Sequence, residues 1–235
     1  MSDPARQLPL ALRYPPDQRL DSFIEAPLGC IAQLRMLAEG NSEDWLFLQG
    51  ADGVGKTHLA LATCAATEVA GRRAAYLPLP AASGRLRSAL DALEGNDLIA
   101  LDGLDAIAGS RDDEVALFDF HNRARSSHIA MLYTAQATPD ALALTLPDLR
   151  SRLSQCTRIA LSTLDDEGRR NILSERAQRR GLVIEEAALD WLLKRTDRDV
   201  TSLTALLDRL DRASLVAQRR VTVPFLRQLI EPERL

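Results

Sequence analysis

Eight residues, Gly50 to Thr57, have the types and the spacing of a loop that binds phosphate. A glycine is followed by four residues and then by Gly55, Lys56 and Thr57, so backbone N–H groups can close around phosphate oxygens. In such loops the lysine reaches the β- and γ-phosphates, and the threonine hydroxyl ligates Mg²⁺. The sequence therefore predicts a nucleotide site with Mg²⁺, lined by Gly50, Asp52, Gly53, Val54, Gly55, Lys56, Thr57 and His58.

A carboxylate that can share the metal follows another apolar run. Residues 98–101 are Leu-Ile-Ala-Leu, and Asp102 comes directly after them. An aspartate at the end of a strand is usually a turn residue, but together with a phosphate-binding loop it predicts a second Mg²⁺ ligand. We therefore expect Thr57 and Asp102 to hold the metal. A chance glycine turn is disfavoured, because an apolar run precedes the loop and a helical pattern follows it.

The elements that position these residues alternate along the chain. Apolar runs typical of strands lie at 45–48, 74–77, 98–101, 129–134 and 158–161, and helical patterns lie at 22–40, 57–70, 84–94 and 113–126. Because parallel strands need crossover connections, this predicts an α/β fold with a five-stranded parallel sheet covered on both faces. After about residue 163 only helical patterns remain, at 165–180, 185–195, 200–217 and 224–230. We expect an extended tail at 1–20, the α/β base at 21–162, and a small all-helical C-terminal domain at 163–235.

Composition excludes several classes of protein. The net charge is −4, which argues against a dedicated duplex-DNA-binding domain. Three cysteines lie far apart in the chain, and neither they nor the three histidines have metal-ligand spacing, so buried reduced thiols are expected (Cys30, Cys64 and Cys156). No run approaches the length that a membrane span needs. These features predict a cytoplasmic protein without membrane contact.

Several segments resemble the bacterial replication initiator DnaA and its AAA+ relatives. His58-Leu59 follows the loop as in that family, residues 146–153 look like its arginine-finger segment, and residues 210–214 and 219–224 look like its lid. The resemblance covers roughly residues 20 to 230. It implies an AAA+ base and lid, with Arg152 as a finger supplied in trans and Thr134 as the first sensor residue. Arg150 is the second choice for the finger, and a structural pairing of Arg152 with Asp148 is the alternative.

The resemblance also implies partners. The chain ends with the lid, whereas an initiator continues into a helix-turn-helix domain, so we expect a short relative that inactivates DnaA by stimulating hydrolysis of its bound ATP. Such relatives work with bound ADP, or ATP, and Mg²⁺. A tail peptide looks like the motif that docks on the polymerase sliding clamp, through Gln7, Leu8, Leu10 and Leu12. A homodimer is a further expectation, and DNA contact is expected to be weak or indirect.

Two positions depart from the family pattern. Gly103 follows Asp102 at the position where efficient AAA+ ATPases have a carboxylate, and the nearest acidic residue is Asp105, two positions further on. In the lid, Thr201 occupies the position where the second sensor arginine is usual, and Arg198 is the candidate that could contact the nucleotide instead. Binding is therefore better supported than turnover. Two alternatives remain: a self-sufficient ATPase such as a helicase loader, and a DNA-binding initiator fragment, for which the arginines of residues 169–180 could supply a basic helix face.

Overall fold

The computed structural model describes residues 19–23, 26–163, 165–179, 181–194 and 220–230. The proposed clamp peptide, with Gln7, Leu8, Leu10 and Leu12, therefore lies outside the described residues. So do Arg198 and Thr201, and the helix expected at 200–217.

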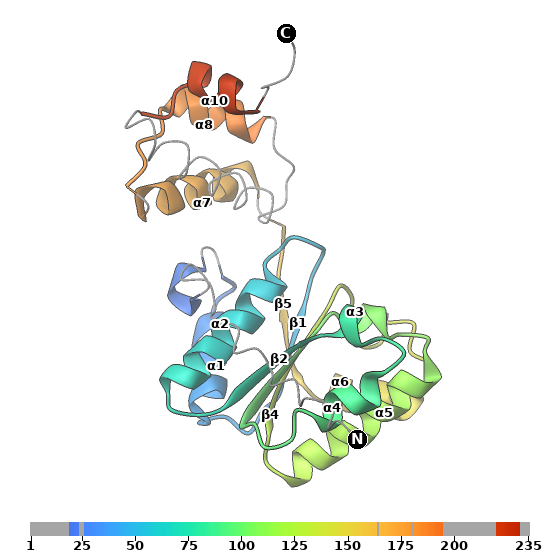
Figure 1. The fold of residues 1–235 in the computed structure, drawn as a ribbon. Coiled ribbons are helices and arrows are strands. Elements are labelled where there is room, and N and C mark those ends of the chain that lie inside the picture. Colours follow the sequence, from blue (N-terminus) through green and yellow to red (C-terminus); the bar gives the residue numbers. More distant parts are fainter. Residues whose placement is uncertain (1–18, 24–25, 164, 180, 195–219, 231–235) are drawn as a thin grey trace, which may run out of the picture.

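A five-stranded parallel sheet forms the centre of the base, as the sequence predicts (Figure 1). The strands are β1 (Leu46–Gln49), β2 (Ala74–Pro78), β3 (Leu98–Asp102), β4 (Ala130–Ala135) and β5 (Thr157–Ala160). Their order is β2-β3-β4-β1-β5, and all four pairings are parallel. Strand β4 is thus central, and β1 lies between β4 and the edge strand β5. The loops after β1, β3 and β4 leave the same edge of the sheet.

Helices cover both faces of this sheet. Helices α1 (Cys30–Glu39) and α2 (Lys56–Val69) pack on one face, and α3 (Leu79–Ala82), α4 (Leu86–Asp91), α5 (Arg111–Ser126) and α6 (Pro147–Ser154) lie on the other. Alternate strand residues divide between the two cores: Leu46 and Leu48 join α1 and α2, whereas Phe47 joins the opposite core. This two-residue alternation is the consequence of the pleat.

The structure shortens two expected helices. The pattern at 22–40 yields the 3-10 turn η1 (Leu20–Ser22) and then α1, because Gly29 adopts a left-handed conformation with φ of 79° at the start of that helix. The pattern at 84–94 becomes α4 alone, with α3 before it and Gly84 at φ of 77° between them. Both interruptions fall at glycines, which adopt positive φ without the steric cost of a Cβ atom.

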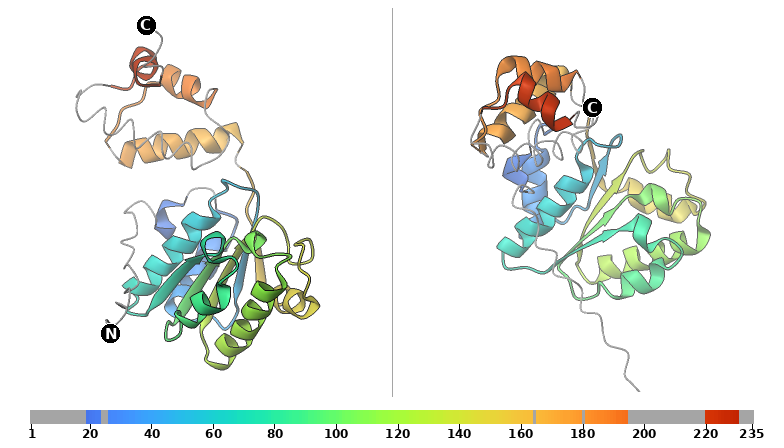
Figure 2. Two further views of the ribbon diagram at one scale, coloured as in Figure 1. Left: turned by 45° about the vertical axis from the view of Figure 1, so that its right-hand side comes forward. Right: turned by 45° about the horizontal axis from the view of Figure 1, so that its top comes forward.

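The C-terminal helices, which Figure 2 shows from two further sides, have a hydrophobic core of their own. Helices α7 (Asp166–Arg179), α8 (Glu186–Leu193) and α10 (Val223–Ile230) pack around Leu173, Trp191 and Leu226. A short parallel bridge between Ile184 and Val221, which the sequence reading missed, joins two loops of this unit. The domain boundary near residue 163 stays a prediction.

The three cysteines are buried and free, as expected. Burial raises the pKa of the Cys30 thiol to about 11 and that of Cys156 to about 12, so both are protonated at neutral pH. Within the described ranges no helix has the length and apolarity that crossing a bilayer requires.

Candidate functional site

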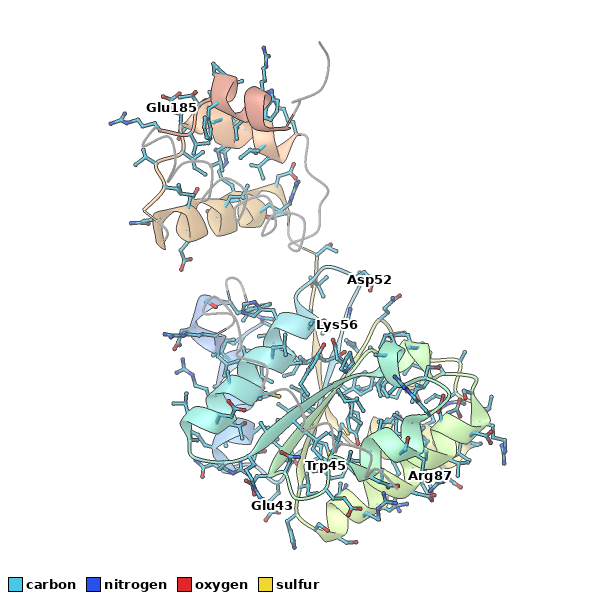
Figure 3. The ribbon with its side chains drawn as sticks, viewed as in Figure 1. Glu43, Trp45, Asp52, Lys56, Arg87 and Glu185 are labelled. Atoms are coloured by element: carbon cyan, nitrogen blue, oxygen red, sulfur yellow. The ribbon has the colours of Figure 1, made fainter. Side chains whose placement is uncertain are left out.

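The phosphate-binding loop joins the carboxyl end of β1 to the first turn of α2, at the top of the base in Figure 3. Gly53 and Gly55 have φ of 76° and 99°, which brings successive backbone N–H groups to the concave side of a loop. Val54 is buried in the core under α2 and anchors the loop. The Lys56 amine donates to the carbonyls of Gly50 at 2.6 Å and Ala51 at 2.8 Å. It is thus held across the loop, where it can reach phosphate oxygens.

An aromatic side chain from the N-terminal segment closes one side of the loop. A Cβ atom on Gly55 would lie 2.5 Å from a ring carbon of Phe23, so only glycine allows this contact. The Phe23 ring lies 5.5 Å from the ring of His58, and His58 Nε2 lies 3.3 Å from the carbonyl oxygen of Arg19. His58 therefore fastens η1 and Phe23 to the nucleotide loop. The sequence reading did not single out Phe23, which no motif marks.

Three hydroxyl groups converge on Asp102. Thr57 and Tyr76 both donate to Oδ2 at 2.7 Å, and Thr134 donates to Oδ1. The sequence analysis missed Tyr76, which lies on the neighbouring strand β2 and on the same face of the sheet as Asp102. Burial raises the pKa of Tyr76, and the charge and hydrogen bond of Asp102 raise it further, so the hydroxyl keeps its proton. Thr57 and Asp102 lie together as the metal prediction requires, and their oxygens are the donors that Mg²⁺ prefers.

Gly103 directly follows Asp102 and supplies no carboxylate. It adopts φ of 88°, and its N–H donates to the Thr134 hydroxyl at 2.9 Å. The next acidic residue, Asp105, lies in the 3-10 turn η2 (Leu104–Ala106) and accepts the N–H of Gln136 at 2.9 Å. Asp105 therefore has a defined partner at the end of β4.

Gln136 is a third residue of this site that the sequence analysis missed, after Phe23 and Tyr76. Its side-chain amide donates to both carboxylate oxygens of Asp52, at 2.9 and 3.0 Å. Burial lowers the pKa of Lys56, while the charges of Asp52, Asp105 and Asp102 oppose that shift. The negative charges of three aspartates in this region therefore favour the charged form of Lys56.

Arg152 lies at the other end of the sheet from this nucleotide loop. Helix α6 leads into β5, and the N–H of Thr157 at the start of β5 donates to the carbonyl of Trp45, just before β1. The nucleotide loop instead leaves the far end of β1, a strand of four residues, so about 13 Å separates the two ends. Within the described part of the chain Arg152 forms no ion pair, so the expected alternative pairing with Asp148 is not made. Arg150, by contrast, donates to the carbonyl of Leu144 at 2.5 Å.

A buried glutamate holds the loop that leads into α6. Glu114 is fully buried, and its carboxylate accepts the N–H groups of Gly109, Thr145 and Leu146 at 2.7, 3.0 and 2.7 Å, and the Thr145 hydroxyl at 2.9 Å. Burial acts to raise the pKa of Glu114, but these hydrogen bonds outweigh it and lower the pKa below 4.5. Glu114 thus fixes the start of the helix that carries Arg152.

Other charged groups have structural partners. In the C-terminal unit, Arg169 is 2% exposed and pairs with Asp166 at 3.1 Å, and Arg170 pairs with Asp190. Both arginines of the predicted basic helix face therefore have a carboxylate partner, and Arg170 stays partly exposed. No cluster of three or more His, Cys, Asp or Glu side chains suited to a metal occurs among the residues that the structure covers.

Comparison with known proteins agrees with this architecture. Residues 166–230 match the family model described as Hda, lid domain. Domain III of the replication initiation protein DnaA from Thermotoga maritima is similar, with a TM-score of 0.75 and 18% identity over 93% of this chain and 98% of that chain. The T. maritima RuvB Holliday junction branch migration motor gives a TM-score of 0.65 and 20% identity over 93% of this chain and 72% of that one.

A structure of DnaA bound to AMPPCP and single-stranded DNA has a TM-score of 0.70 and 20% identity, covering 83% of this chain. This chain spans 65% of the length of that DnaA structure. At these sequence identities the structural likeness establishes the fold alone. The family model adds a relationship to Hda for residues 166–230. The chain therefore has the fold of DnaA domain III, and its residues 166–230 match the lid domain of Hda.

Proposed function

We propose that this chain inactivates DnaA: docked on the DNA-loaded sliding clamp, it stimulates hydrolysis of DnaA-bound ATP through Arg152 and so prevents re-initiation. The observation that carries the proposal is the position of Arg152 at the end of the sheet opposite its own nucleotide loop. An arginine there serves a nucleotide held by another protein. It stabilises the charge that grows on the γ-phosphate during transfer.

The chain's own nucleotide has a structural role in this proposal. We infer that an adenine nucleotide, ADP or ATP, binds at Gly50–Thr57 between base and lid, and that Thr57 and Asp102 hold Mg²⁺. When bound, the metal neutralises phosphate charge. The backbone N–H groups of the loop and Lys56 bind the phosphates, and Phe23 covers the loop beside Gly55. The relatives support an adenine nucleotide, since AMPPCP is bound in two of the DnaA structures.

A self-sufficient ATPase, such as a helicase loader, is the second candidate. The likeness to the RuvB motor favours it, and Asp105 is the carboxylate that it would use. Gly103 opposes it, because a residue without a side chain follows Asp102 and cannot orient the attacking water. We therefore expect little or no ATP hydrolysis by this chain alone.

The other partners follow from the sequence. The peptide with Gln7 and Leu10 is proposed to bind the clamp in an extended form, in the cytoplasm, where DnaA acts. A homodimer and weak or indirect DNA contact complete the proposal.

The test measures ATP hydrolysis by purified DnaA, with this protein and DNA-loaded clamp added singly and together. We expect turnover only with both additions, with loss of stimulation for Arg152→Ala and for the double variant Gln7→Ala/Leu10→Ala. Arg87→Ala is the matched control, since Arg87 pairs with Asp119 on an exposed surface of α4 and α5. Hydrolysis by this chain alone, independent of the clamp, would refute the proposal and favour the motor.

A further inference from the structure

A second arginine lies at the same end of the sheet as Arg152, opposite the nucleotide loop. Arg152 is in the last turn of α6, which leads into β5, and Arg125 is in the last turn of α5, which leads into β4. The two helices pack against each other in the core on one face of the sheet. Because β4 and β5 both run parallel to β1 and flank it, the two helices end at the same edge of the sheet. Both arginines therefore belong to this edge.

An aromatic ring fixes the direction of the Arg125 side chain. Trp45 lies just before β1, at the end of the sheet away from Lys56 (Figure 3). The guanidinium carbon of Arg125 lies 5.7 Å from the centre of the Trp45 ring, which is the geometry of a cation–π contact. The Trp45 carbonyl accepts the N–H of Thr157, in the segment that follows the helix of Arg152. Arg125 is thus exposed to solvent and yet held beside that segment.

The imidazole on which both arginines act carries no charge. His121 is buried, its ring lies 4.4 Å from that of Trp45, and its Nδ1 lies 3.0 Å from the Tyr133 hydroxyl oxygen. Burial and the charges of Arg125 and Arg152 lower the pKa of His121 to about 4, so both guanidinium groups are near enough to act on it. Neither arginine forms an ion pair with any residue that the structure describes. The two positive charges therefore share this edge without a carboxylate.

A nearby arginine of the same helix shows the contrast. Arg123 lies 5.6 Å from the centre of the Phe120 ring, but it also pairs with Asp91 at 2.9 Å and with Glu94 at 3.7 Å. Arg125 has the aromatic contact alone. Positive charges that share a surface repel each other, and the planar guanidinium fork matches the oxygens of a phosphate group. The edge therefore presents oriented donors for a phosphate group that another molecule supplies.

We propose that Arg125 is a second arginine that acts in trans, on the phosphate groups of the same DnaA-bound ATP that Arg152 serves. The proposal rests on the proposed function and adds a residue that no sequence motif marks. In the hydrolysis, the water oxygen bonds to the γ-phosphorus while the bond from that phosphorus to the β–γ bridging oxygen breaks. ADP keeps the electron pair, one water proton stays on the phosphate product, and the other passes to solvent. Negative charge grows on the bridging and γ-phosphate oxygens, and a second guanidinium stabilises it most in the transition state.

The experiment measures the rate of hydrolysis of DnaA-bound ATP, with DNA-loaded clamp and increasing amounts of the full chain. Arg125→Ala should lower the maximal rate at least about tenfold. It should change the half-maximal concentration of this chain less than about threefold, because the contact strengthens in the transition state. A residue with only a docking role would raise the half-maximal concentration instead. Arg125→Lys should recover part of the rate, since lysine keeps the charge and lacks the planar fork.

Arg123→Ala is the matched control, because Arg123 has the same helix and the same kind of aromatic contact, but its charge is paired. It should stimulate hydrolysis as wild type does. Thermal unfolding of Arg125→Ala should give a Tm within a few degrees of wild type, since only an exposed cation–π contact is lost.

Two sets of outcomes separate this proposal from the proposed function. If Arg152→Ala abolished stimulation while Arg125→Ala kept the wild-type maximal rate, the role of Arg125 alone would be overturned. The same holds if Arg125→Ala changed only the half-maximal concentration. If wild type did not stimulate hydrolysis, or if Arg152→Ala stimulated it as wild type does, the proposed function itself would be refuted.

Discussion

Replacing Glu114 by glutamine should destabilise the base by about 4 kcal/mol at neutral pH. The carboxylate accepts two donors on each oxygen, three from the backbone and one from the Thr145 hydroxyl. A glutamine offers one acceptor oxygen and one NH₂ group. The least costly arrangement points the NH₂ at Leu146 and at the Thr145 hydroxyl, which can turn to accept. The Leu146 N–H then has no acceptor, and this costs about 1–3 kcal/mol, with weaker bonds to the neutral amide adding about 1 kcal/mol each.

The effect must diminish in acid. The pKa of Glu114 is lowered in the folded state relative to 4.5 in the unfolded state. The carboxylate therefore contributes stability above pH 4.5, and that contribution is lost as the pH falls through the folded-state pKa. Wild type and variant should converge in that window.

The assay is urea unfolding followed by tryptophan fluorescence. The chain has two tryptophans, so a Trp191→Phe background leaves Trp45, which packs in the base core, as the reporter. Glu94→Gln is the control, because Glu94 is exposed and pairs weakly with Arg123 at 3.7 Å, and it should change stability by less than about 0.5 kcal/mol. If Glu114→Gln changed the free energy of unfolding by less than about 1 kcal/mol, the hydrogen-bond reasoning would be wrong.

Three other perturbations have definite expectations. Burial, Arg125 and Arg152 lower the pKa of His121 from 6.5 to about 4, so stability is lost as pH falls from 6.5 towards 4, by about 3 kcal/mol. Urea titrations against pH should show this loss in wild type and not in His121→Gln. Arg150→Ala should lower the free energy of unfolding by about 2 kcal/mol, because the hydrogen bond to the Leu144 carbonyl is lost. Arg152→Ala should instead abolish the stimulation of DnaA and leave the Tm unchanged. If Arg150→Ala abolished stimulation and Arg152→Ala lowered stability, Arg150 would be the finger and Arg152 the structural residue. Gly55→Ala should weaken ADP binding at least about tenfold, because the φ of 99° at Gly55 and the Phe23 ring exclude a Cβ atom. Titration with fluorescent ADP measures this Kd, and a variant that binds ADP as tightly as wild type would contradict the contact.

The local features of the nucleotide site were predictable from the sequence. The loop at Gly50–Thr57 and the strand ending in Asp102 depend on neighbouring residues, and each is recognisable in a window of eight residues or fewer. The five strands were predicted correctly because short apolar runs that alternate with helical patterns are typical of buried parallel strands. Element boundaries were less accurate, since α1 and α4 begin after the left-handed Gly29 and Gly84, whereas the apolar pattern alone would have extended both helices towards the N-terminus.

Only the tertiary structure decided which distant residues meet. Gln136 and Asp52 are 84 positions apart, and Glu114 and Leu146 are 32 apart. Their contacts depend on the order of the strands, which places β4 between β1 and β3 and is not written in any local pattern. The position of Arg152 at the far end of the sheet from Lys56 likewise follows from the direction of α6 and β5. Residue type and spacing determine what chemistry is available, whereas the parallel register determines which groups lie within hydrogen-bonding distance.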